Sequence, residues 1–436
     1  MNSINDDPGY SASALGERIE IMLVCVAAVF VLLGTYDRSF GDTANSRLAT
    51  VYSLSHYGTW FIDRPLDEKP IRFEQGTIDK VMVNGHVLSS KPPLLPLFMT
   101  GEYIILNKLF GYDLDKREDS DDLLRIMSMT FVGSAYLAAV FFSLLILRMF
   151  IADPLARLVT LFTIAFCTQM WGYSTNLNNH VPGAGLTVVA IYLALGLGSE
   201  KLAPTAWRFA LFGLASGLVV TVDMPAAIFP FLGALYLLLK FPRQVLTWAA
   251  LGAAIPIGLQ SAILYSLTGS PLPVQTHKPF YLYESSYWRQ PREIDALTEP
   301  KLTYLFHITL GRCGLFSLFP VLLLGVAAVI RCIARPKSPL RGAIITGALG
   351  FLVLTAYYLC STNNYGGQAY GFRWFICAMP VLALMGAPVL STIRSRWKWV
   401  FLCVMIGISF YSSWESTKDP WAANHQWTCR FLGKSY

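Results

Sequence analysis

The feature that most constrains this chain is a series of long apolar runs, which recur from Ile21 to Trp414. A run of about 17 to 25 apolar residues is long enough to cross the hydrocarbon core of a bilayer as a helix. A helix also satisfies its own backbone polar groups, which the bilayer interior requires. Charged residues make up only 14% of the 436, against roughly a quarter in soluble proteins. The sequence therefore predicts an all-α polytopic membrane protein and excludes a soluble enzyme or a disordered interaction protein.

We predict about eleven transmembrane helices from the lengths of these runs. A further apolar segment, 94–110 (LLPLFMTGEYIILNKLF), either crosses the membrane or lies at its surface, since it contains Pro96, Glu102 and Lys108. The eleven predicted spans are residues 20–36, 123–147, 157–174, 184–199, 208–222, 224–240, 246–267, 313–331, 342–360, 374–392 and 398–413.

The distribution of Lys and Arg decides how segment 94–110 is placed, because cytoplasmic connectors carry an excess of both. If the segment does not cross, connectors 174–183 and 361–372, which contain no Lys or Arg, lie outside. We therefore predict an interfacial or re-entrant helix at 94–110. The basic clusters then all face the cytoplasm, at residues 148–157, 201–208, 240–243, 331–341 and 394–398.

This topology predicts a multi-pass protein of the cell (inner) membrane whose first helix is an uncleaved signal-anchor. The net charge of +7 is explained by the orienting clusters, so we expect membrane lipids and no nucleic acid as partners. The predicted parts are a cytoplasmic N-terminus (1–19), the first transmembrane helix (20–36), an external loop with juxtamembrane helices (37–122), transmembrane helices (123–267), an external loop (268–312), transmembrane helices (313–413) and an external tail (414–436).

Polar residues beside the predicted spans gather on the outer face. Ionisable groups in or beside a span are costly, and they commonly mark functional sites. Taken singly, each also fits an ordinary role as a solvated loop residue, a helix cap or an interfacial anchor. Their convergence on one face predicts that the chemistry takes place there. The residues are Asp37, Asp42, Lys91, Asn178, Asn179, His180, Asp223, Arg312, Asn364 and Arg373.

A carboxylate together with several cations at a membrane surface suits attack on a phosphate-linked substrate. The carboxylate acts as general base on an acceptor hydroxyl, and Lys or Arg neutralises the charge on a departing phosphate. The chain contains no HExxH, GxSxG, P-loop or Rossmann motif, so nucleotide-driven and serine-hydrolase chemistries have no support.

The order of motifs resembles the GT-C superfamily of integral-membrane glycosyltransferases, which includes aminoarabinose transferases and protein O-mannosyltransferases. The shared motifs are an acidic residue before a juxtamembrane helix, here Asp42 with TANSRLATVYSLSHYG, the KPPL element at 91–94, and the NYGG…GFRW element between 364 and 374. The chain departs from the family pattern where Ala44 and Asn45 replace an acidic pair. Asp42 is therefore the first candidate for the base and Asp37 the second.

This resemblance implies transfer of a sugar from a polyprenyl-phosphate donor to an acceptor glycan, lipid or protein on the extracytoplasmic face. The implied base is Asp42 or Asp37, and the implied phosphate ligands are Lys91 and Arg373, with His180 or Arg312. Some relatives use a divalent metal, for which Asp42, Asp223 and nearby Asn residues offer oxygen ligands. No cofactor follows with certainty. The implied substrate-binding residues are Lys91, Arg373, His180, Asn179, Asp223, Arg312 and Asn364.

Two other classes of function remain open at this point. A transporter or flippase of a lipid-linked substrate binds near the bilayer midplane with repeated halves, whereas the polar residues here lie at one surface and the halves show no similarity. A catalytically inactive scaffold gives no transfer product and tolerates Asp42→Ala.

Overall fold

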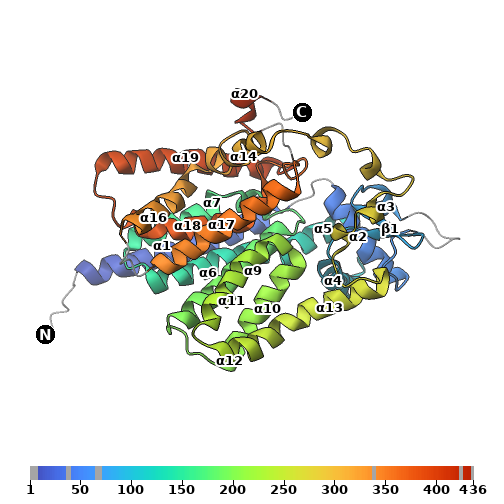
Figure 1. The fold of residues 1–436 in the computed structure, drawn as a ribbon, viewed down its shortest axis with the longest axis horizontal. Helices are drawn as coiled ribbons and strands as arrows, with labels where there is room; N and C mark the ends of the chain where they lie inside the picture. The colour runs from blue at the N-terminus through green and yellow to red at the C-terminus, as the bar shows by residue number, and fades with distance from the viewer. Residues whose placement is uncertain (1–7, 36–40, 64–70, 336–339, 422–425, 434–436) are drawn as a thin grey trace.

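The computed structural model describes residues 8–35, 41–63, 71–335, 340–421 and 426–433. The long helices form one bundle, and the segment between α1 and α5 folds as a separate layer at one end of it (Figure 1). The bundle comprises α1 (Pro8–Gly34), α5 (Arg117–Met127) with α6 (Ser134–Phe150), α7 (Pro154–Phe166), α9 (His180–Gly198), α10 (Ala206–Val222), α11 (Ile228–Leu238), α13 (Ala250–Thr268), α16 (Leu323–Ala334), α17 (Arg341–Ser361), α18 (Met379–Leu390) and α19 (Arg396–Lys418).

Short helical elements extend or connect these helices. A π-helical turn joins α5 to α6, and several 3-10 turns shape the segment between α13 and α16. The elements are η1 (Ser128–Gly133), α8 (Gln169–Tyr173), η2 (Met224–Ala227), α12 (Pro242–Gln244), η3 (Val245–Ala249), η4 (Val274–Thr276), η5 (Lys278–Tyr281), η6 (Tyr287–Arg289), η7 (Glu293–Ala296), α14 (Lys301–Thr309), α15 (Leu315–Leu318), η8 (Pro320–Leu322), η9 (Arg373–Ala378) and α20 (Cys429–Leu432).

The architecture is nearly all-α with several apolar helices, which agrees with the prediction apart from one β-hairpin. Within the described residues, five helices are long and apolar enough to cross a membrane, and four shorter helices are also apolar. Each predicted span coincides largely with helix, while the number of about eleven crossings and the division into membrane and loop regions stay predictions. The five long helices are Arg117–Phe150, His180–Gly198, Pro242–Thr268, Arg341–Ser361 and Arg373–Leu390.

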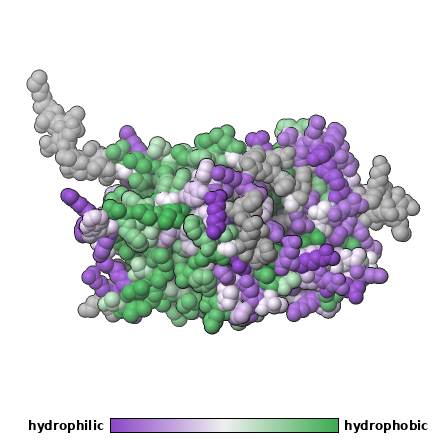
Figure 2. All heavy atoms as spheres, turned by 90° about the horizontal axis from the view of Figure 1, so that it is seen from above, coloured by the Kyte–Doolittle hydropathy of each residue, from purple (hydrophilic) through white to green (hydrophobic). Residues whose placement is uncertain are grey.

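On the face that Figure 2 shows, most of the bundle is apolar with hydrophilic residues at its far end, whereas the end formed by α2, α3 and β1 is mostly hydrophilic. Large apolar side chains point outward from the bundle helices: Leu239, Ile255 and Phe401 are 86%, 67% and 63% exposed. Apolar patches of this extent are rare on soluble monomers, and they are the surface that lipid tails cover.

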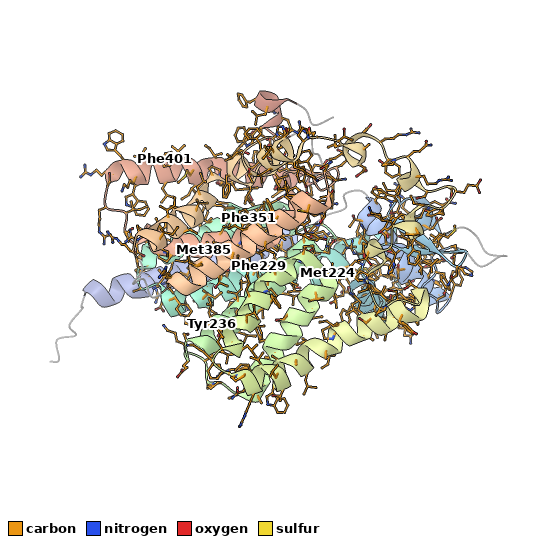
Figure 3. The ribbon with its side chains drawn as sticks, viewed as in Figure 1. Met224, Phe229, Tyr236, Phe351, Met385 and Phe401 are labelled. Carbon is orange, nitrogen blue, oxygen red and sulfur yellow. The ribbon has the colours of Figure 1, made fainter. Side chains whose placement is uncertain are left out.

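Glycines on α17 allow neighbouring helices to approach it closely. A Cβ at Gly347 would lie 2.7 Å from the sulfur of Met385 on α18, and one at Gly350 would lie 2.8 Å from the ring of Phe229 on α11. Figure 3 labels Met385 and Phe229 together with Phe351 of α17. Small residues at such contacts are typical of helix packing in membranes.

The segment before the KPPL element is a β-hairpin, whereas the sequence predicted only juxtamembrane helices in this loop. Strands β1 (Lys80–Val83) and β2 (His86–Ser89) pair antiparallel, with Lys80 opposite Ser89. Asn84 and Gly85 form the turn with φ of 53° and 84°, the left-handed values that a tight hairpin turn requires. This register sets the residues just outside the strands, Asp79 and Ser90, side by side.

Three helices pack together beside the hairpin. The predicted juxtamembrane segment forms α2 (Asp42–His56), which packs against α4 (Leu94–Phe110), and α3 (Arg72–Gln75) lies beside α2. One face of α4 is buried, whereas Leu109 and Phe110 on its outer face are 70% and 69% exposed. A helix with one packed face and one exposed apolar face is consistent with the predicted interfacial position.

Candidate active site

A cavity of about 690 Å³ lies where the hairpin layer meets the bundle. Segments distant in sequence line it, including the start of α2, the foot of the hairpin, the start of α9, the end of α10 and the NYGG…GFRW connector. Its polar lining includes Asp42, Asp79, Lys91, Asn178, Asn179, His180, Asp223, Gln260, Asp295, Asn364 and Arg373. The predicted convergence of polar residues therefore corresponds to one cavity, apart from Asp37 and Arg312.

Lys91 forms an ion pair with Asp79, whose Oδ2 lies 2.6 Å from the Lys91 Nζ. The hairpin creates this pair, because the Ser90 N–H donates to the Asp79 carbonyl and so fixes the two segments side by side. Burial raises the pKa of Asp79, but Lys91, Arg373 and Arg47 outweigh it and hold that pKa below its ordinary value. Asp79 is therefore a carboxylate at neutral pH.

Three cations and one carboxylate lie close together at the cavity, and we call this group, Arg47, Lys91, Arg373 and Asp79, the cationic cluster. Asp79, Lys91 and Arg373 line the cavity, and Arg47 is buried behind the lining residue Asn179. Burial and the charge of Arg373 lower the pKa of Arg47 to about 10. Burial also lowers the pKa of Lys91, and the positive charges of Arg47 and Arg373 add to that effect. Cations that repel one another around a single carboxylate leave an excess of two positive charges, which an anion such as a phosphate would balance.

Both arginines of the cluster have a side-chain N–H donor without a hydrogen-bond partner among the described residues. Arg47 is fully buried and donates to the Thr43 carbonyl and to the Asn179 Oδ1 at 2.9 and 3.1 Å. The Nε atoms of Arg47 and Arg373 are buried without a hydrogen-bond partner in the described structure. A buried unmade hydrogen bond is costly, so these donors favour an anionic ligand.

The Gly366-Gly367 turn and Trp421 position Arg373. Both glycines have positive φ, 96° and 71°, and a Cβ at Gly366 would lie 3.1 Å from the Arg373 Cγ. The Arg373 guanidinium lies 5.1 Å from the ring centroid of Trp421, a cation–π distance. Asn364 holds the turn, because its Oδ1 accepts the N–H groups of both glycines.

Asp42 is a cavity carboxylate that forms no ion pair among the described residues. Its Oδ1 accepts the Ile78 N–H at 2.7 Å, which orients the side chain, while the residue as a whole remains exposed in the cavity. Desolvation by its surroundings raises the pKa of Asp42, and the neighbouring Asp79 adds to this effect. A general base works best when its pKa approaches the operating pH, so Asp42 suits that role better than the ion-paired Asp79.

His180 and Asp223 form a buried pair, with 3.0 Å between the His180 Nδ1 and an Asp223 carboxylate oxygen. Gly183 allows α9 this close approach, because a Cβ there would lie 2.6 Å from the Asp223 Cβ. The neighbouring Asn178 caps the helix start, accepting the Val181 N–H at 3.0 Å. The pair lies in the cavity wall, with His180 and Asp223 only 7% and 6% exposed.

Two predicted site residues are not part of this cavity. Arg312 forms an ion pair with Glu299 at 3.0 Å and lies over the ring of Tyr365. Its charge is therefore balanced by Glu299, and its side chain does not line the cavity. Asp37, the second candidate for the base, lies outside the described residues.

Among the described residues, the candidate metal ligands Asp42 and Asp223 are not part of a group of three close His, Cys, Asp or Glu ligands. Asp223 is bonded to His180 and Asp42 to the Ile78 backbone. Within the described part of the chain, the one group of three close ligands is elsewhere.

Sequence reasoning missed Asp79 and Trp421 and did not assign a role to Arg47. Asp79 was detectable, because Asn84-Gly85 between alternating Val residues is a strong hairpin signal that sets Asp79 beside the KPPL element. No local signal identifies Trp421, which meets Arg373 only through the fold.

Comparison with solved structures gives the class of this fold. ArnT from Cupriavidus metallidurans in the apo state matches with a TM-score of 0.55 and 13% identity, covering 90% of this chain and 62% of that one. ArnT bound to undecaprenyl phosphate matches with a TM-score of 0.53 and 13% identity, covering 89% of this chain and 62% of that one. The Archaeoglobus fulgidus oligosaccharyltransferase tethered with an acceptor peptide matches with a TM-score of 0.50 and 14% identity, covering 93% and 55%.

These structures are GT-C glycosyltransferases, and the chain has their fold, as the sequence resemblance predicted. The matches span less than two thirds of the length of those chains. No protein-family model and no curated protein sequence matches the chain.

Proposed function

We propose that this chain is a membrane glycosyltransferase that moves a sugar from a polyprenyl-phosphate donor to an acceptor hydroxyl. The observation that carries the proposal is the cavity in which Asp42 lies beside the cationic cluster. The GT-C fold supports it, since one neighbour is bound to undecaprenyl phosphate and another is tethered with an acceptor peptide. The acceptor here is a glycan, a lipid or a protein.

The reaction is a direct displacement at the anomeric carbon of the donor. The acceptor oxygen forms a bond to that carbon as its proton moves to Asp42, and the bond from the carbon to the phosphate oxygen breaks. The electron pair of the broken bond leaves with the polyprenyl phosphate, whose growing negative charge Lys91 and Arg373 stabilise. The configuration at the sugar is therefore inverted.

Each remaining cavity residue holds one of these groups in place. Asp79 holds the Lys91 ammonium at the foot of the hairpin, and Asn179 orients the buried Arg47 behind it. Asn364 shapes the turn around Arg373 and also donates to Asp295. Such positioning keeps the donors fixed before charge develops, which is where most of the rate enhancement arises.

We further propose that the cavity opens on the extracytoplasmic face of the inner membrane. The support is the distribution of Lys and Arg, which orients the basic connectors inward and leaves 37–122, 268–312 and 414–436 outside. The donor lipid tail then lies along the apolar bundle surface near the cavity.

Release of polyprenyl phosphate tests the proposal without knowledge of the acceptor. Purified chain is incubated with a panel of polyprenyl-phosphate sugars and a delipidated envelope extract, and the released lipid phosphate is measured by mass spectrometry. We expect release by the natural chain and its loss in Lys91→Ala. The matched control is Lys80→Ala, which breaks a comparable ion pair with Glu74 in the same layer but does not line the cavity.

Equal release by Lys91→Ala and the natural chain would contradict the proposed site. Movement of intact donor across proteoliposomes, without release of lipid phosphate, would instead favour a transporter or flippase. Failure of every donor in the panel, together with unchanged behaviour of Asp42→Ala, would favour a scaffold.

A further inference from the structure

A second cluster of ligand-type side chains lies outside the cavity, at the far end of α2. One ligand atom each from His56, Asp113 and Asp115 lies within 4.8 Å of the others. His56 is the last residue of α2, and the two aspartates lie in the connection between α4 and α5. The proposed transferase mechanism uses none of these residues.

The surroundings leave one nitrogen of His56 free to bind a metal. Its Nδ1 lies 3.1 Å from the Tyr52 carbonyl oxygen and 3.0 Å from the Ser55 hydroxyl. The Ser55 hydroxyl donates to the Val51 carbonyl at 2.7 Å, so both neighbours of Nδ1 accept, which favours a protonated Nδ1. The proton on Nδ1 leaves the lone pair on Nε2, the tautomer found in most metal-ligating histidines. Stacking on Tyr52 at 4.1 Å and on Tyr103 at 5.9 Å fixes the plane of the ring.

The two carboxylates are oriented by similar outer contacts. The Tyr52 hydroxyl donates to the Asp115 Oδ1 at 2.9 Å, and the Asp115 N–H donates to the Asp113 Oδ1 at 2.9 Å. Each aspartate keeps its second oxygen for a ligand. Neither forms an ion pair within the described residues, since the nearby Lys116 pairs with Asp119 instead. Two adjacent carboxylates without a cationic partner favour a bound cation.

We propose that His56, Asp113 and Asp115 bind a zinc ion that ties the end of α2 to the α4–α5 connection. One imidazole nitrogen and two carboxylate oxygens form a mixed set that suits zinc better than calcium or magnesium, which prefer oxygen alone. Ligands of one tetrahedral zinc lie about 3.3 Å apart, so a small rotation of the exposed Asp115 carboxylate and the half-buried Asp113 carboxylate closes the site around the ion. Water completes the coordination.

The site has a structural consequence for the cavity. The two segments that it joins each reach the active site at their other ends, through Asp42 at the start of α2 and Leu124 on α5. Bound zinc therefore stabilises the folded chain against heat and leaves the donor site chemically unchanged.

Zinc titration of the full-length chain, with the affinity tag removed and the metal stripped by chelator, tests this proposal. The exposed Cys25, Cys360 and Cys403 are first replaced by Ser, because free thiols also bind zinc. We expect one equivalent of zinc to bind and to raise the thermal midpoint. We expect His56→Ala and Asp113→Asn each to lower the zinc affinity at least tenfold, because each variant removes one zinc ligand.

His86→Ala is the matched control, because His86 pairs with a single carboxylate, Asp63, at 3.1 Å and lies in the same layer. It should bind zinc as the natural chain does. Equal zinc affinity in His56→Ala, or no binding at one equivalent, would overturn the proposal. If His56→Ala fails to fold, Asp115→Asn gives the same comparison. Donor turnover is not the readout, so failure here leaves the transferase proposal standing.

Discussion

Replacement of Asp42 by Asn isolates its role as a base. In the natural chain the Ile78 N–H donates to the Asp42 Oδ1 at 2.7 Å. The side-chain oxygen of Asn can accept the same hydrogen bond, so the contact between α2 and the hairpin segment survives. What disappears is the ability to take a proton. General-base catalysis contributes about 10²–10⁴-fold to rate, which corresponds to about 3–5 kcal/mol of barrier. We expect kcat/KM for lipid-phosphate release to fall by that factor at an unchanged thermal midpoint.

The pH dependence of the same reaction gives an independent check on Asp42. The base must be ionised, so activity is lost as pH falls through its folded pKa. Desolvation raises that pKa above the ordinary aspartate value, and the acid limb of kcat/KM therefore lies at higher pH than for an exposed aspartate. The pKa of Asp79 is held low instead. If Asp79 were the base, the acid limb of kcat/KM would therefore lie at lower pH than for an exposed aspartate. The reasoning is refuted if Asp42→Asn keeps its rate within about threefold, a loss of under 1 kcal/mol.

Three further predictions concern the cavity wall and the topology. Lys91→Ala should abolish donor turnover at the tested concentrations with the fold retained, and turnover equal to that of Lys80→Ala would contradict its role. His180→Ala should reduce turnover less than Lys91→Ala does, but it should lower stability by about 1–3 kcal/mol because the buried Asp223 carboxylate loses a partner; a large rate loss with no change in denaturation would argue for a direct catalytic role. In a background lacking the exposed cysteines, Lys116→Cys should react with an impermeant maleimide from outside the cell, since that side chain is 66% exposed, whereas Arg394→Cys should react only after permeabilisation. The reverse labelling pattern would show that 94–110 crosses the membrane.

The lengths of the apolar runs and the order of the motifs were the most informative features of the sequence. Apolar runs predicted the all-helical bundle, and the KPPL and NYGG…GFRW elements predicted the GT-C fold. The same elements placed Lys91, Asn364 and Arg373 in one group, and the structure brings them to one cavity with Asp42.

The rest of the site depends on contacts between distant segments. Arg312 looked equivalent to Arg373 at the head of a helix, but Glu299, thirteen residues earlier, pairs with it in the fold. Arg47 was recognised only as the arginine of the juxtamembrane-helix motif, because nothing local shows that its guanidinium is fully buried beside Asn179. Such pairings join residues far apart in the chain, and sequence periodicity carries no information about them.

The central claim is that the cationic cluster holds the phosphate of a polyprenyl lipid next to Asp42. The most direct test is a cryo-electron-microscopy map of the purified chain with added polyprenyl phosphate. The account predicts density for the phosphate in contact with Lys91 and Arg373, with the lipid tail leaving along the apolar bundle surface. A phosphate bound elsewhere, with these two side chains apart and the cavity opening to each side of the membrane in turn, would contradict it.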